Sequence, residues 1–231
     1  MVPIIPLRHF FDNPEKAFAK LSPDGSRIAY LAPEEGRLNV WVKTIGLDDD
    51  HSVTHDRERP VISYFWSRDS KKILYLQDQG GNENTHVYAA DPTQPDLEAK
   101  DLTPFDDVKV NIVDVPRETP NEILISMNKR EAGLFDVHRL DLNSGKTELI
   151  AENPGNIVGW LTDAEGKLRA AVAQTPNGSS SLDLARTSRS GRSSSTTTRT
   201  RESLTRSRRM VQRCMWDPPR MLSTKGSCCS T

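Results

Sequence analysis

Hydrophobic and polar residues alternate in short runs along the first 185 residues, and each run follows a turn-forming segment. Four of these runs share one register, in which Ile28, Ile73, Ile123 and Leu168 occupy the same place after the turn. Their spacings are 45, 50 and 45 residues, and a four-stranded propeller blade takes about 40 to 50 residues. The period therefore predicts a repeated blade and argues against a single β-sandwich.

Further strands are expected on both sides of each run. Alternating stretches at 38–43, 85–91 and 135–141 follow the first hairpins, and turns rich in Gly, Asn and Asp separate them. Stretches at 61–66 and 157–162 precede two of the hairpins and carry aromatic residues, which we expect to pack between neighbouring blades. The predicted fold is all-β: a partial β-propeller of about four four-stranded blades.

Helical periodicity is weak in the same part of the chain, and 13–19 is the best candidate for a short helix. We therefore divide the chain into a lead-in segment at 1–19, a partial propeller at 20–185 and a tail at 186–231. No apolar run approaches the roughly 18 residues that a membrane-spanning helix needs. The first eleven residues carry charge where a signal peptide has its apolar stretch, so we expect a cytoplasmic protein.

The tail differs in composition from everything before it. It holds 11 Lys and Arg against 2 Asp and Glu, which leaves 20 against 30 in the preceding residues. All three cysteines, Cys214, Cys228 and Cys229, lie in it. Residues 1–185 therefore offer no thiol for a disulfide, a metal site or a cysteine nucleophile, and the adjacent pair in the tail has no zinc-site spacing.

Three interpretations of the tail remain open. Its Arg, Ser and Thr residues are typical of a disordered extension, or they form a basic arm for nucleic acid. The third interpretation is a frameshift near Ala185. Codons can be chosen for the start of the tail so that, when they are read one frame over, they encode an acidic peptide that contains Phe, Val and Tyr. Such a peptide resembles the preceding residues. It also supplies a strand at the point where the fourth blade needs one. We favour the frameshift.

Motifs in the four repeats point to a family. Leu21-Ser22-Pro23-Asp24-Gly25 opens the first repeat, and Asp78-Gln79-Gly80-Gly81-Asn82-Glu83-Asn84 lies in the second. Asn128-Lys129-Arg130 follows in the third repeat and Glu152-Asn153-Pro154-Gly155-Asn156 in the fourth. Together these motifs resemble the N-terminal β-propeller of prolyl oligopeptidase-family serine peptidases, in the branch of the acylaminoacyl-peptidases and dipeptidyl peptidases. The resemblance covers residues 6–184.

The resemblance implies a propeller that lies over an α/β-hydrolase domain and restricts entry to peptides. In that family a Ser within Gly-x-Ser-x-Gly attacks the scissile carbonyl, with Asp and His as partners. This sequence contains no Gly-x-Ser-x-Gly. We therefore assign no catalytic residue and no cofactor, and we expect the chain to be inactive alone.

A polar loop at 80–84 is the candidate for a surface that faces substrate. Glu83 and Asn84 could bind a peptide amine or carbonyl, although glycines with capping side chains are also typical of a tight structural turn. Arg130 and Asp136 could pair across the third hairpin. The five histidines are scattered and the run Asp48-Asp49-Asp50 lacks the alternating ligands of a calcium loop, so we predict no metal site.

The favoured function is the substrate-gating, non-catalytic part of a serine peptidase that cleaves peptides or acyl-peptides. Peptide substrate is then a partner only in the intact enzyme. An incomplete propeller leaves blade edges open, which predicts self-association, and we expect no membrane or nucleic-acid partner. The alternatives are a free-standing interaction propeller whose basic tail binds nucleic acid, and a peptidase completed by a separately encoded hydrolase chain.

Overall fold

The computed structural model describes residue 12 and residues 14–184, which contain fifteen strands in four antiparallel sheets and no helix. Blade 1 consists of β1 (Ala17–Leu21), β2 (Arg27–Glu34), β3 (Arg37–Thr44) and β4 (His51–Ser52). Blade 2 consists of β5 (Tyr64–Trp66), β6 (Ile73–Asp78), β7 (Thr85–Ala90) and β8 (Lys100–Asp101). Blade 3 consists of β9 (Val110–Asp114), β10 (Glu122–Glu131), β11 (Leu134–Asp141) and β12 (Thr147–Ala151). Blade 4 consists of β13 (Ile157–Thr162), β14 (Leu168–Gln174) and β15 (Ser180–Leu184).

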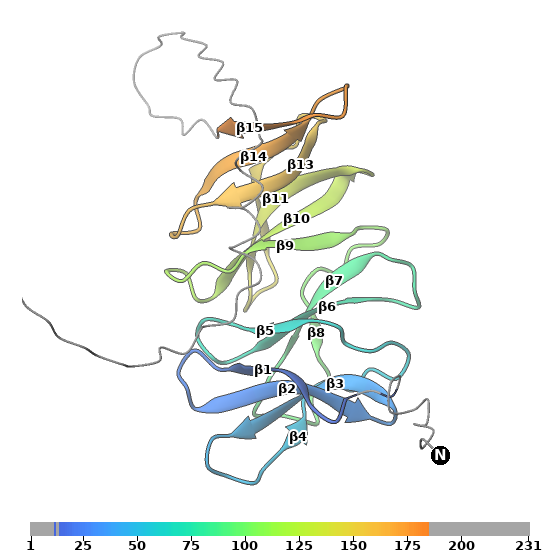
Figure 1. The fold of residues 1–231 in the computed structure, drawn as a ribbon, viewed down its shortest axis with the longest axis vertical. Helices are drawn as coiled ribbons and strands as arrows, with labels where there is room; N and C mark the ends of the chain where they lie inside the picture. Colours follow the sequence, from blue (N-terminus) through green and yellow to red (C-terminus); the bar gives the residue numbers. More distant parts are fainter. Residues whose placement is uncertain (1–11, 13, 185–231) are drawn as a thin grey trace, which may run out of the picture. The chain divides into compact units, whose positions relative to one another are not determined.

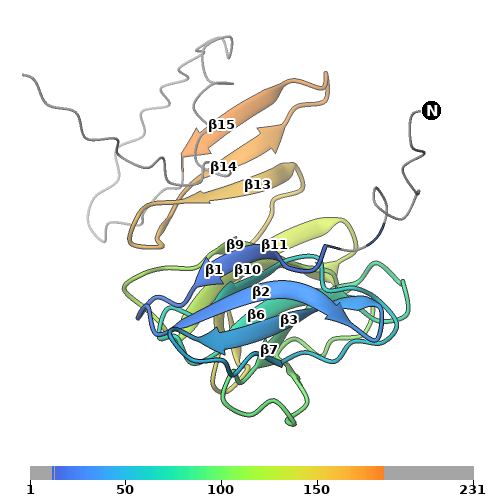
Figure 2. The same ribbon diagram turned by 60° about the horizontal axis from the view of Figure 1, so that its bottom comes forward.

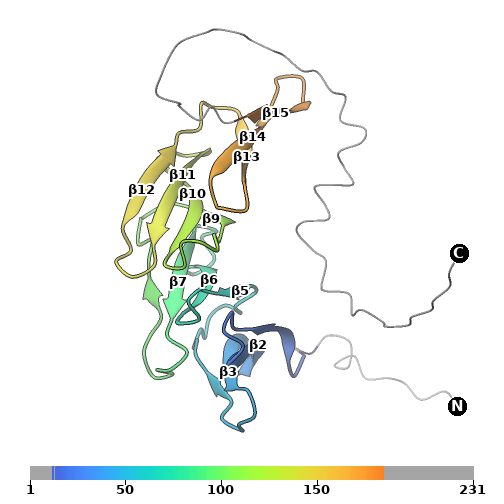
Figure 3. The same cartoon turned by 90° about the vertical axis from the view of Figure 1, so that its left-hand side faces the viewer.

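The strands of each sheet pair in chain order (Figure 1). Figure 2 shows β13, β14 and β15 side by side as the three-stranded sheet of blade 4. Figure 3 shows the order β12, β11, β10 and β9 in blade 3. The predicted all-β propeller fold is confirmed.

The predicted repeat register is also confirmed. Ile28, Ile73, Ile123 and Leu168 all lie at or next to the start of the second strand of their blade. The pairings of Ile28 with Lys43, Ile73 with Ala90 and Ile123 with Leu140 are equivalent. A period found in the sequence therefore corresponds to one β-sheet per repeat.

The prediction of a short helix at 13–19 is wrong, because the described residues of this segment, 14–19, contain no helical turn. Ala17 begins β1, which pairs with β2 through Lys20 and Ala29. A register shift lies between Ala17 and Lys20, and Phe18 has a φ of 52°. This irregular backbone breaks the alternation that identifies a strand, which is why the sequence pattern failed here. The tail assigned to 186–231 lies outside the described residues.

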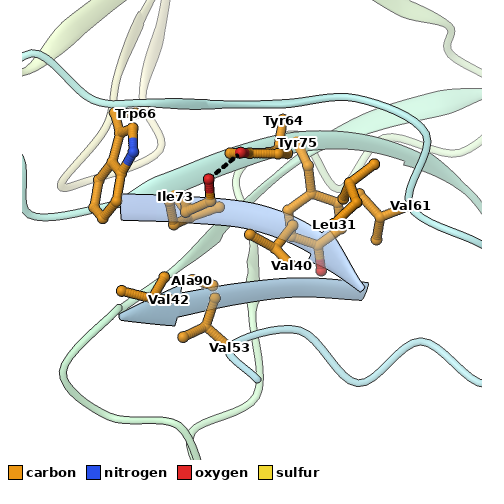
Figure 4. Packing of buried hydrophobic residues seen from close by; sticks show 11 residues of the cluster. Leu31, Val40, Val42, Val53, Val61, Tyr64, Trp66, Ile73, Tyr75 and Ala90 are labelled. Atoms are coloured by element: carbon orange, nitrogen blue, oxygen red, sulfur yellow. Dashed lines mark hydrogen bonds between the residues drawn. The ribbon is translucent and has the colours of Figure 1, made fainter. Parts of the chain in front are cut away.

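The hydrophobic core consists of layers between successive blades. Between blades 1 and 2, Leu31, Val40 and Val42 pack against Tyr64 and the residues around it (Figure 4). A second cluster joins blades 2 and 3 and includes Leu74, Val87, Leu102, Val110, Ile123, Ile125, Met127 and Leu140. Burial of one such aliphatic side chain contributes roughly 1.5 to 3 kcal/mol, so each blade depends on its neighbour for stability.

Aromatic side chains on first strands join the blades, as the sequence predicts. The Trp66 indole donates to the Lys20 carbonyl of blade 1 at 3.1 Å, and the Trp160 indole donates to the Phe135 carbonyl of blade 3 at 3.0 Å. The Tyr64 hydroxyl lies 2.7 Å from the Ala29 carbonyl (Figure 4). These rings fill the space between sheets while their polar atoms stay hydrogen-bonded. Within the described part of the chain, no helix has the length and apolarity needed to cross a membrane.

Candidate functional site

The polar loop singled out in the sequence joins β6 to β7 in blade 2. In an antiparallel blade, this turn lies at the same end as the connections that lead from one blade to the next. We call this the connection end. Gly80, Gly81 and Glu83 adopt φ values of 61°, 84° and 63°, a left-handed conformation that is unfavourable for a side chain such as that of Glu83.

The backbone of this loop is held by short polar side chains. The Asp78 carboxylate accepts a hydrogen bond from the Glu83 N–H at 3.2 Å, and the Asn82 side chain accepts one from the Asn84 N–H at 3.0 Å. Glu83 is exposed and Asn84 is half-buried. These hydrogen bonds use the backbone N–H groups of Glu83 and Asn84, so the structural role considered for the loop is present. The Glu83 side chain is open to solvent.

Arg59 fastens this loop to the connection between blades 1 and 2. Its Nε lies 3.1 Å from the Asp78 carboxylate, and a Cβ on Gly81 would lie 2.9 Å from its Nη1. Gln77 donates to the Asp56 carboxylate at 2.6 Å and to the Arg59 carbonyl at 3.2 Å. Sequence reasoning missed these partners because Asp56 and Arg59 lie some twenty residues before the loop, in a connection without periodicity.

A buried polar residue in the third strand of blades 1 to 3 contacts either the fourth strand or the connection just after it. Asn39, His86 and Asp136 occupy equivalent register positions and are all buried. The side-chain Oδ1 of Asn39 accepts hydrogen bonds from the Thr54 hydroxyl and from the Asp56 N–H, both at 2.9 Å. The equivalent contacts are His86 Nδ1 to the Asp101 carboxylate at 2.7 Å and the Asn153 N–H to Asp136 at 2.7 Å. We call these three residues the blade latches.

The alignment of the repeats could have revealed the latches. In each of the first three blades, the repeated isoleucine of the second strand pairs with a residue of the third strand. The latch is the polar residue four positions before that paired residue. The same register in blade 4 falls on Leu182, which is 58% exposed. Blade 4 therefore lacks the polar latch that the other three blades carry.

The suggested pair of Arg130 and Asp136 forms across the third hairpin. Arg130 Nε and Nη2 donate to the two carboxylate oxygens at 2.8 Å each, and Nη2 also donates to the Asn153 carbonyl at 2.9 Å. The Arg130 guanidinium lowers the pKa of Asp136 despite the burial that favours its neutral form. Asp136 is only 2% exposed, so this pair is more than a surface salt bridge.

The charged groups considered for metal binding have protein partners. Lys16 and Lys43 lie 2.8 and 2.9 Å from the Asp50 carboxylate, and Asp49 accepts from the Thr44 N–H at 2.8 Å. Hydrogen bonds from Lys16, Tyr30 and Lys43 lower the pKa of Asp50. Among the described residues, no three His, Cys, Asp or Glu side chains are placed to hold a metal ion.

Sequence comparison gives two curated relatives. The chain is 38% identical over 169 residues to dipeptidyl aminopeptidase BIII of Pseudoxanthomonas mexicana, which covers 73% of this chain and 24% of the relative. It is 28% identical over 188 residues to dipeptidyl peptidase family member 6 of Caenorhabditis elegans, covering 77% of this chain and 24% of that protein. The chain is a homologue of prolyl oligopeptidase-family peptidases. It spans about a quarter of the length of these relatives.

Solved structures support the propeller fold of this homologue. The β-propeller domain of the trilobed protease from Pyrococcus furiosus matches with a TM-score of 0.51 at 17% identity, over 74% of this chain and 54% of that domain. Prolyl oligopeptidase B from Galerina marginata matches with a TM-score of 0.52 at 15% identity, over 73% of this chain and 26% of that structure. No protein-family model matches the chain.

Proposed function

We propose that this propeller part controls access of peptides to the active site of a serine peptidase and has no peptidase activity on its own. The main support is its homology to a dipeptidyl aminopeptidase combined with a sequence that has no Gly-x-Ser-x-Gly. The nucleophile, its base and its oxyanion hole must all come from outside a propeller of this kind.

Inactivity is tested with the purified chain. We expect no labelling by a fluorophosphonate probe and no release of a chromogenic group from dipeptidyl substrates. An active dipeptidyl peptidase in the same assay is the positive control. Labelling of the chain at a serine would contradict the proposal and require a nucleophile that the sequence does not signal.

Glu83 is the proposed substrate contact. Its exposed carboxylate stands in a loop whose backbone is fixed by Asp78 and Asn82, and a carboxylate is suited to the charged amino terminus of a peptide. In a titration with a tripeptide followed by amide NMR, we expect shifts in 79–84 that E83Q removes. The matched control is E165Q, at a turn of the opposite end. Equal shifts in both variants would exclude Glu83.

We also propose that the change in composition after Leu184 arises from a shift of reading frame. The support is the abrupt change from net acidic to strongly basic sequence, together with a match to the first relative that is 169 residues long in a chain of 231. The test is the nucleotide sequence around codon 185. A neighbouring frame that encodes further propeller strands and a Gly-x-Ser-x-Gly is expected, whereas stop codons in both other frames would refute the shift.

A further inference from the structure

Two histidines of blade 1 hold a connection of blade 2. His51 Nε2 lies 3.0 Å from the Pro92 carbonyl and His55 Nε2 lies 2.7 Å from the Pro95 carbonyl. Both carbonyls belong to 91–97, part of the connection between β7 and β8. Proline has no backbone N–H. At Pro92 and Pro95 the connection therefore contacts blade 1 through backbone carbonyl oxygens.

The second nitrogen of each ring also faces an acceptor. His51 Nδ1 lies 2.8 Å from the Asp49 carbonyl, and His55 Nδ1 lies 3.0 Å from the nearer carboxylate oxygen of Glu34 in β2. Carbonyl and carboxylate oxygens only accept hydrogen bonds. A neutral imidazole carries one N–H and can satisfy one of its two acceptors, whereas the imidazolium carries two and satisfies both.

The charges around His55 favour its protonated form. Glu34 from β2 and Asp96 from the connection act on His55, and Asp49 and Asp50 directly precede His51 in the chain. Partial burial disfavours the charged ring of His55, but the bonds to the Pro95 carbonyl and to Glu34 outweigh it and raise the pKa. Asp91, at the start of the connection, is bound instead to Thr93 and Gln94.

We propose that protonation of His55 fastens the connection at 91–97 to blade 1, so that the joint between the first two blades loosens as the pH rises through the neutral range. The direction follows from the contacts. Each proton lost on a rise in pH removes one of the two donors of a ring and leaves one acceptor unpaired. The tie through His55 is complete below the ordinary pKa of histidine, about 6.5, and is lost as the pH rises through the raised pKa of His55 in the folded state.

The test is amide hydrogen exchange of 91–97 in the full chain at pH 5.5 and pH 8.0, corrected for intrinsic exchange rates. We expect protection to fall by about threefold to tenfold at the higher pH, where tenfold corresponds to a shift of one pKa unit. The double variant H51Q/H55Q should show low protection at both pH values. The matched control is H138Q on β11, which should retain the pH dependence.

A second measurement keeps the proposal testable if the double variant fails to fold. E34Q removes the charged partner of His55, so the ring proton of His55 should titrate at lower pH in NMR. Protection that does not change with pH in the unmodified chain would overturn the proposal. An undiminished pH dependence in H51Q/H55Q, or an unchanged His55 titration in E34Q, would do so as well.

Discussion

Blades 1 to 3 and blade 4 repeat the same strand pattern but are stabilised differently. The first three blades bury large side chains between their sheets and carry a buried polar latch. Blade 4 buries chiefly Ala170, Ala171 and Ala173, and leaves Val158 and Leu182 largely exposed. The comparison shows that a repeat sequence is sufficient to form a sheet, whereas stability depends on what each sheet packs against.

The largest expected difference concerns the aromatic core. Tyr64→Ala should lower the free energy of unfolding by about 4 kcal/mol, because it leaves a cavity between blades 1 and 2. Val158→Ala, at a position that is 63% exposed in blade 4, should cost less than about 0.5 kcal/mol. Urea unfolding of both variants measures the difference, and similar losses would show that blade 4 is packed as tightly as blades 1 and 2.

The latch of blade 3 should have the next largest effect. Asp136→Ala removes the acceptor of the buried Asn153 N–H and of the partly exposed Arg130 guanidinium, and leaving a buried donor unpaired costs about 1 to 3 kcal/mol. Leu182→Ala, at the equivalent register of blade 4, should cost less than about 1 kcal/mol. Thermal unfolding followed by circular dichroism distinguishes the two. A small loss in Asp136→Ala would mean that the latch is not what holds the connection.

Acid should weaken blade 3 through the same residue. The pKa of Asp136 is lowered in the folded state, so its contribution is complete above the unfolded value of about 3.9 and is lost as the pH falls through the folded value. The difference in stability between the unmodified chain and Asp136→Asn should therefore shrink below about pH 4. Hydrogen exchange from pH 3 to 7 tests this, and a difference that does not vary with pH would contradict it.

The smallest effect is expected from single inter-blade hydrogen bonds. Trp66→Phe and Trp160→Phe each remove an indole donor while keeping an aromatic ring, which should cost about 1 kcal/mol plus a small packing loss. Local exchange should rise at β1 in the first variant and at β11 in the second. If only Trp66→Phe has an effect, the contact of blade 4 with blade 3 contributes little to stability.

The sequence predicted the strands better than the candidate site. The second and third strands were identified from short apolar runs that follow turns, and in the second strands of blades 1 to 3 the buried residues form continuous runs, since both faces of these sheets are covered. The irregular β1 escaped, since the left-handed Phe18 breaks the alternation of a regular strand. Glu83 and Asn84 were found as a polar loop, but their fixation depends on Asp78 and Arg59, and the Arg59 contact crosses from one connection to another.

The sequence by itself determined the repeat, the register of the isoleucines and the composition change after Leu184, because all three are properties of residue order. Only the tertiary structure decided which polar residues become latches and which histidines meet the carbonyls of the next blade. Aligned repeats show that Asn39, His86 and Asp136 are polar residues at one register, but their side chains differ, so their partners follow only from the structure. They are equivalent because antiparallel pairing brings each to the same register beside the end of its blade, where a buried polar side chain needs a hydrogen-bond partner.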